Sequence, residues 1–222
     1  MCGRFTLTVD PGELQEAFNV SVPSQYTSRY NIAPSQPVAV IPNDGAPHLD
    51  FFVWGLIPSW AKDPSIGNRM INARAETLAE KPSFRTSFRR RRCLVLADGF
   101  YEWQKQADGK GKIPMYIQLK SKKPFAFAGL WDLWHASDGS EIPSCTIITT
   151  EPNSMMATIH NRMPVILPKE SYAFWLDPAE KKADQLSPLL KPYPTEEMLA
   201  YPVSRMVNSP NNDTPACIQP LA

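Results

Sequence analysis

Short hydrophobic runs and alternating hydrophobic and polar positions predict that much of this chain forms strands. Strand-like segments cover residues 38–41, 51–57, 93–97, 100–105, 115–119, 125–130 and 144–149. The pair Asp108 and Gly109 suits the loop of a hairpin between two of these segments. The 23 prolines are spread along the whole chain and break it into short elements, which argues against a bundle of long helices.

Helices are predicted to be short and peripheral. The first begins with Asp10 as N-cap, followed by Pro11 and Glu13 in the first turn, and its apolar positions 14, 17 and 18 share one face. Shorter helices are expected over residues 153–159, 170–176, 179–190 and 195–200. No linker or repeat divides the chain. We therefore predict one α+β domain over residues 2–222, rich in β-structure, with a central barrel-like or two-sheet core.

Composition narrows the class of protein. No apolar run reaches the length of a membrane span, and nothing at the N-terminus resembles a signal peptide. The four cysteines lack CxxC spacing and the three histidines are isolated from one another, so we expect free thiols, no metal and no other cofactor. We expect a cytoplasmic monomer, nucleoid-associated if the source is bacterial.

Basic residues are concentrated in one stretch, although the net charge of the whole chain is only +1. Residues 68–92 contain eight basic side chains against Glu76 and Glu80, which gives a net charge of 8 − 2 = +6. This stretch is either a solvated basic face or a surface that follows the phosphates of a nucleic acid. Its charge alone does not choose between the two.

The second residue is a cysteine, and removal of Met1 would leave Cys2 with a free α-amine beside its own thiol. Such a 1,2-aminothiol condenses with an aldehyde through the amine and then closes a five-membered thiazolidine ring through the sulfur. The ordinary pKa of an α-amine lies below that of a thiol, so the amine is the group expected to attack first. A cysteine at this position can also be incidental, so its role depends on the rest of the chain.

Three further positions are suited to proton transfer or orientation. Alternation along 100–105 places Glu102 on the face opposite Tyr101 and Trp103. Two interpretations are open for this glutamate. Burial among aromatic residues would raise its pKa and suit it to act as a general acid or a general base; alternatively it is a rim glutamate that leans into water. His160 is either a proton-transfer group or a hydrogen-bonded structural residue. Asn72 can orient a substrate without adding charge.

Other residues are suited to a nucleic acid. Arg74, two positions after Asn72, can hold a phosphate. Trp54, Trp60 and Trp103 offer aromatic surfaces that could stack on nucleobases, although tryptophans more often lie in a core.

Seven short motifs occur in order between residues 2 and 205: CGRF at 2–5, YNIAP at 30–34, WGLIPSW at 54–60, NARAET at 72–77, DGFYEW at 98–103, HNRMP at 160–164 and PVSR at 202–205. In this combination the chain resembles the SRAP (SOS-response-associated peptidase) family of abasic-site processing proteins. The resemblance covers nearly the whole chain. The arginine run at 89–92 is not part of it.

The resemblance implies a mature protein that starts at Cys2 and crosslinks covalently to abasic sites in single-stranded DNA, with autopeptidase and lyase activities as further expectations. It implies a catalytic set of Cys2, Asn72, Glu102 and His160. It also implies that DNA is contacted by Arg4, Arg74 and Arg162. The groove that receives the DNA is implied to be shaped by Asn31, Pro34, Trp60 and Trp103. Two other functions stay open: an N-terminal-nucleophile hydrolase or peptidase, and a single-strand binding module in which Cys2 plays no part.

Overall fold

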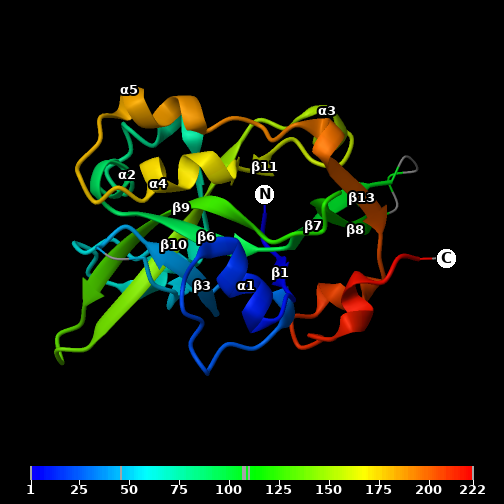
Figure 1. Cartoon of the computed structure of the whole chain (residues 1–222), viewed down its shortest axis with the longest axis horizontal. Helices are drawn as coiled ribbons and strands as arrows, with labels where there is room; N and C mark the ends of the chain where they lie inside the picture. The colour runs from blue at the N-terminus through cyan, green and yellow to red at the C-terminus, as the bar shows by residue number, and fades with distance from the viewer. Residues whose placement is uncertain (1, 46, 107–108, 110, 222) are drawn as a thin grey trace.

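Two β-sheets form the body of the molecule (Figure 1). The structure is a computed structural model that describes residues 2–45, 47–106, 109 and 111–221. Within these ranges the smaller sheet has the order β13-β8-β7-β1-β2, and the larger has the order β11-β10-β4-β3-β6-β9-β12 with β5 beside β10. The strands are β1 (Phe5–Leu7), β2 (Arg29–Ile32), β3 (Pro37–Pro42), β4 (Asp50–Trp54), β5 (Asn72–Arg74), β6 (Arg92–Ala97), β7 (Gly99–Lys105), β8 (Lys112–Leu119), β9 (Phe125–His135), β10 (Glu141–Thr150), β11 (Met163–Pro164), β12 (Ile166–Leu167) and β13 (Met198–Pro202). The predicted α+β class with a two-sheet core is confirmed.

The helices are short and lie outside the sheets. They are α1 (Pro11–Phe18), α2 (Arg85–Arg90), α3 (Ser154–Ala157), α4 (Tyr172–Trp175) and α5 (Ala183–Leu186), with 3₁₀ turns between them. Figure 1 shows α2, α4 and α5 gathered on one side of the larger sheet. The N-terminus of α1 is capped as predicted, because the Glu13 N–H donates to Asp10 Oδ1 at 3.0 Å. Over the described residues no helix is long and apolar enough to cross a bilayer.

Most predicted strands are confirmed, and the departures have local causes. The segments 38–41, 93–97, 100–105 and 115–119 lie in β3, β6, β7 and β8, while β9 and β10 are longer than predicted. The predicted strand 51–57 ends at Trp54, because Gly55 has a φ of +139° and approaches the backbone of Gly67 closely. Asp108 of the predicted hairpin loop lies outside the described residues; β7 and β8 on either side of it pair antiparallel.

The helix predictions hold less well towards the C-terminus. Helices α3, α4 and α5 lie inside the predicted segments 153–159, 170–176 and 179–190 but are shorter. The helix predicted at 195–200 is wrong. One 3₁₀ turn at Thr195–Glu197 is followed by β13, which pairs with β8 from Met198 opposite Leu119 to Pro202 opposite Met115. A pairing between segments about 80 residues apart has overridden the local helical pattern.

Strand β1 is completely buried and fixes the start of the chain. Phe5 packs edge-on against Trp54 and Phe127, with ring centroids 5.0 and 5.8 Å apart. The strand pairs with β7 on one side and with β2 on the other. In the middle of the strand Thr6 Oγ1 donates to the buried Asp98 carboxylate at 2.5 Å. These contacts hold the residues immediately before Phe5 in a defined place.

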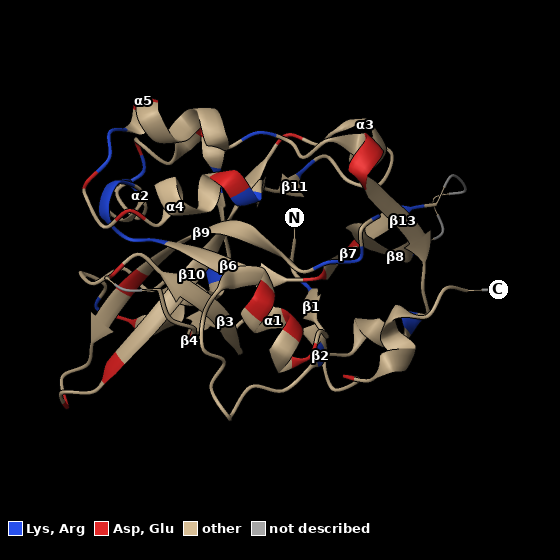
Figure 2. Ribbon diagram, in the orientation of Figure 1, with Lys and Arg blue, Asp and Glu red and all other residues tan. Residues whose placement is uncertain are grey.

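The arginine run at 89–92 is used by the fold. Arg89 and Arg90 both pair with Glu180, and Arg91 pairs with Asp132. Arg92 is fully buried, and its guanidinium donates to five backbone carbonyls: those of Phe88, Arg89, Trp175, Asp177 and Ala179. Figure 2 shows the basic α2 at one end of the molecule, away from the N-terminus. This run fastens α2 to the 175–180 segment.

Replacing Arg92 by methionine is expected to lower the free energy of unfolding by at least about 3 kcal/mol, because several buried carbonyls lose a charged donor and methionine supplies none. Urea unfolding of Arg92→Met measures the loss. The matched control is Arg90→Met, which breaks only an exposed pair and should cost less than about 1 kcal/mol. Equal small losses in both variants would contradict the structural role of Arg92.

Candidate functional site

Cys2 is buried three residues before β1, where two other motifs meet it. Its carbonyl oxygen accepts a hydrogen bond from Asn72 Nδ2 at 2.8 Å. The Tyr101 N–H donates to the carbonyl of Arg4 at 2.9 Å and so extends the β1–β7 pairing towards the N-terminus. This register, continued by one residue, places Gly3 opposite Glu102. The cysteine, the asparagine and the glutamate of the predicted catalytic set therefore gather at one place.

Glu102 lies under the surface and beside the cysteine. Glu102 is only 3% exposed, so the alternative of a rim glutamate that leans into water is wrong. Alternation along β7 is as predicted: Phe100 packs in the main core, and Tyr101 and Trp103 pack in a second cluster on the other face. Burial, and after it the negative charge of Glu102, raises the pKa of the Cys2 thiol above its usual range. The sulfur is therefore a neutral thiol at physiological pH.

Asn72 begins β5, which runs parallel to β10 with Asn72 opposite Ile147. With its Nδ2 committed to Cys2, its Oδ1 is buried and has no hydrogen-bond partner among the described residues. Buried polar atoms are normally paired, and an exception in a site points to a group that arrives with a ligand. The amide is therefore placed to orient a donor next to Cys2.

His160 follows α3 and is held in the same region by hydrogen bonds. Gln104, on the same face of β7 as Glu102, donates through Nε2 to the Thr158 carbonyl at 2.9 Å. The Arg162 N–H lies 3.1 Å from His160 Nδ1. The Arg162 carbonyl lies 3.3 Å from the same nitrogen, so both polar groups of the Arg162 backbone hold the imidazole ring in place. Gln104 is a support of the site that the sequence alone did not single out.

Arg4, Asn31 and Trp103 form one hydrogen-bonded group with the C-terminal segment. Arg4 Nη1 donates to Asn31 Oδ1 and to the Val207 carbonyl, both at 2.8 Å, and its guanidinium lies 5.9 Å from the centre of the Trp103 ring. Asn31 is fully buried and donates to three carbonyls of residues 207–212. Asn31 thus supports Arg4 from behind the surface.

The aromatic residues fall into two groups. Trp60 is 61% exposed and Trp103 is half-buried, so both present ring surface to solvent, and Pro34 is half-buried after β2. Trp54, which the sequence offered as a stacking surface, is not one. It is fully buried, packs on Phe5 and donates its Nε1–H to the Ile71 carbonyl.

The arginine of the HNRMP motif is paired with a glutamate of the NARAET motif that the sequence reasoning missed. Arg74 is exposed at the end of β5. Arg162 is mostly buried and binds Glu76 through both of its terminal nitrogens, at 2.6 and 3.0 Å. Both residues of this pair lie in quoted motifs, but 86 positions apart in the sequence, where no local pattern connects them.

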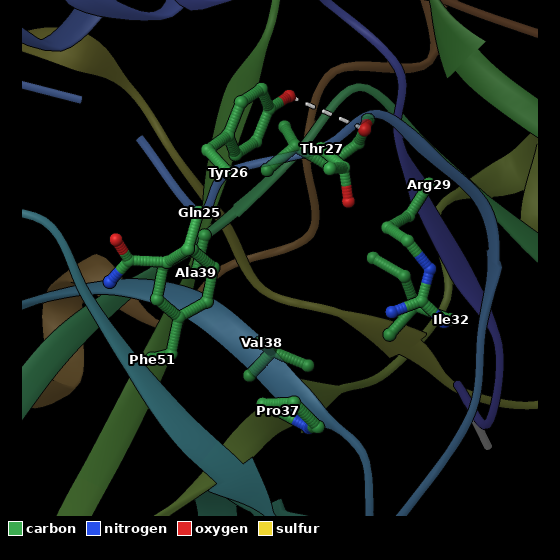
Figure 3. A pocket seen from close by; sticks show the side chains of 10 residues that line it. Gln25, Tyr26, Thr27, Arg29, Ile32, Pro37, Val38, Ala39 and Phe51 are labelled. Atoms are coloured by element: carbon green, nitrogen blue, oxygen red, sulfur yellow. Dashed lines mark hydrogen bonds between the residues drawn. The ribbon is translucent and has the colours of Figure 1, made fainter. Parts of the chain in front are cut away.

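A separate cavity of about 410 Å³ opens between β1, β3, β4 and the segment before β2 (Figure 3). Its walls are largely apolar, among them Leu7, Ile32, Val38 and Phe51, and the Tyr26 hydroxyl beside it donates to the Val9 carbonyl. None of the predicted catalytic residues lines it. This cavity is therefore distinct from the place where the predicted catalytic residues gather.

Comparison with known proteins gives a consistent result along the chain. A family model described as "SOS response associated peptidase (SRAP)" matches residues 1–210. The abasic site processing protein YoqW of Bacillus subtilis is 52% identical over 223 residues, which covers 99% of each chain. The abasic site processing protein HMCES of Xenopus tropicalis is 32% identical and covers 98% of this chain and 78% of its own. A crystal structure of a protein from Bacteroides thetaiotaomicron matches with a TM-score of 0.90 and 31% identity, covering 100% of both chains.

Proposed function

The chain belongs to the SRAP family, and we propose that it recognises abasic sites in single-stranded DNA and bonds covalently to them through Cys2. The observation that carries this proposal is the meeting of Cys2 with Asn72 and Glu102 just before β1. The names of relatives at 52% and 32% identity identify the lesion. The open-chain form of an abasic deoxyribose supplies the aldehyde that a 1,2-aminothiol requires.

The first bond forms at nitrogen. Removal of Met1, which lies outside the described residues, gives Cys2 its free α-amine. The neutral amine attacks the aldehyde carbon, and loss of one water leaves an imine. Burial keeps the Cys2 sulfur protonated, so it does not compete for the aldehyde as a thiolate. Glu102 takes a proton from the amine and returns one to the departing hydroxyl.

The second bond forms at sulfur. The Cys2 thiol adds to the imine carbon, and its proton moves to the imine nitrogen, which closes the thiazolidine ring. Asn72 holds the Cys2 backbone by its Nδ2, and its Oδ1 is placed to accept from the amine or from a sugar hydroxyl. His160 exchanges a proton with the ring oxygen of the closed sugar and so favours the open aldehyde.

DNA is held by the residues around this centre. Arg4, Arg74 and Arg162 bind flanking phosphates, and the exposed rings of Trp60 and Trp103 stack on bases or fill the place of the missing one. Holding the sugar over Cys2 turns a slow bimolecular condensation into a local reaction. A missing base also removes much of the stacking energy that opposes extrusion of a nucleotide.

Self-cleavage before Cys2 is a second candidate activity. In it the Cys2 sulfur attacks the carbonyl carbon of Met1 while Glu102 takes the thiol proton, and the amide nitrogen of Cys2 accepts that proton and leaves as the free amine. Water then hydrolyses the thioester between Met1 and the Cys2 sulfur, which releases methionine and restores the thiol. The closeness of Glu102 to the thiol favours it. A lyase reaction of the bound sugar would follow from the imine.

Intact-mass measurement tests the main proposal. Protein lacking Met1 is expected to gain the mass of an abasic oligonucleotide minus one water. An oligonucleotide with the tetrahydrofuran analogue, which has no aldehyde, is the matched control and should add nothing. If protein that has lost Met1 forms no adduct with the abasic strand, the proposed function is wrong.

A further inference from the structure

The guanidinium of Arg162 already holds a carboxylate in the free protein. Its Nη1 and Nη2 donate to the two oxygens of Glu76 at 2.6 and 3.0 Å, and Nη2 also donates to the Thr149 carbonyl at 2.6 Å. This parallel pair of hydrogen bonds is the same fork that arginine offers to two oxygens of a phosphate. Glu76 therefore occupies the position where Arg162 would bind a DNA phosphate.

Glu76 is exposed enough to leave that position. Its side chain is 51% exposed, whereas that of Arg162 is only 15% exposed and stays fixed by the Thr149 carbonyl. An ion pair with a carboxylate open to water contributes little to stability. The pair can thus be opened by moving the glutamate alone.

Glu76 also acts on the neighbouring arginine. The hydrogen bonds from Arg162, and after them the charges of Arg162 and Arg74, hold the pKa of the Glu76 carboxyl below its usual range. The glutamate is consequently negative at physiological pH and offsets one of the two positive charges, those of Arg74 and Arg162, that are proposed to bind phosphate here. Glu80, the other acidic residue of the 68–92 stretch, has no described ion pair, although it is also exposed.

We propose that Glu76 is a specificity-determining residue that competes with DNA phosphate for Arg162 and thereby weakens non-covalent binding of undamaged single strands. The inference rests on the proposed function, because it assumes that Arg74 and Arg162 face the DNA backbone. Intact DNA, which offers no aldehyde, has to displace Glu76 and gains no covalent bond in return. Intact DNA therefore dissociates quickly, whereas an abasic strand that stays bound long enough to react is retained by the covalent bond to Cys2.

Glu76→Gln tests this competition, because it removes the charge and keeps the shape and one acceptor. Fluorescence anisotropy with an undamaged oligonucleotide should give about tenfold tighter binding for the variant at low salt. The plot of log Kd against log salt should become steeper by about 0.7, the value for one more phosphate contact on a single strand. Glu80→Gln is the matched control, since it changes the net charge equally without touching Arg162.

Two outcomes overturn the inference. If Glu76→Gln binds undamaged DNA no more tightly than Glu80→Gln does, charge at this position does not compete. If it binds more weakly, Glu76 positions Arg162 for phosphate. Crosslinking of an abasic strand by the unaltered protein is measured in parallel. If the crosslink forms but the two variants bind undamaged DNA equally, only the competition is refuted. If no crosslink forms, the proposed function is refuted, and the affinity comparison still tests the competition.

Discussion

Cys2→Ala and Cys2→Ser are both expected to lose the stable crosslink to abasic single-stranded DNA completely. Either variant keeps a small second residue, so an aminopeptidase can remove Met1 without the Cys2 sulfur and leave the α-amine. Intact mass selects protein that has lost Met1 for the comparison. Neither keeps the sulfur that closes the ring. The product should stop at the imine, which water reverses.

The two kinds of product are separated by a reductant. On a denaturing gel the unaltered protein should shift the abasic strand without any treatment, because the thiazolidine survives. The variants should shift it only after borohydride has reduced the imine to an amine. Cys217→Ala, which removes another buried free thiol, is the matched control and should crosslink like the unaltered protein. A stable crosslink at full yield from Cys2→Ala would place the nucleophile elsewhere.

The predictions from sequence were most accurate where the signal was local. The cap of α1 is contained in four adjacent residues from Asp10 to Glu13, and the alternation along β7 fixed which side chains share the face of Glu102. Both are confirmed because each depends on geometry within one element. Even so, the sequence could not decide whether Glu102 is buried, since its burial depends on β1 and on the N-terminal residues that pack beside it.

The features that the sequence did not predict depend on contacts between residues far apart in the chain. The arginine run at 89–92 was open to interpretation as a DNA-binding surface. The glutamate and the aspartate that engage it, and three of the five carbonyls bound by Arg92, come from residues about 40 to 90 positions away. The Glu76–Arg162 pair is equally non-local. The edge strand β13 forms where a local pattern favoured a helix, because β8 offers it a row of backbone partners. Charge and periodicity indicate what a segment can do, and the tertiary contacts select among these options.

Glu102→Gln is expected to slow crosslink formation by about 10²–10⁴-fold, the range that general acid–base catalysis supplies. Glutamine has nearly the same shape and fits the same buried position on β7, but it neither takes nor returns a proton. Quenched time courses with an abasic strand measure the rate. Non-covalent affinity for an undamaged strand should change little, because Glu102 lies beside the reacting atoms and is not one of the proposed phosphate contacts.

A merely structural role for Glu102 would have a different result. It would lower the unfolding temperature and the affinity for DNA together, and Glu102→Asp, which keeps a carboxylate one methylene shorter, would be no better than Glu102→Gln. A proton-transfer role predicts that Glu102→Asp recovers part of the rate. It also predicts slower release of a preformed crosslink in Glu102→Gln, because a group that lowers the barrier in one direction lowers it equally in the other. Unchanged rates in both directions would remove Glu102 from the chemistry and leave proton transfer to His160 or to water.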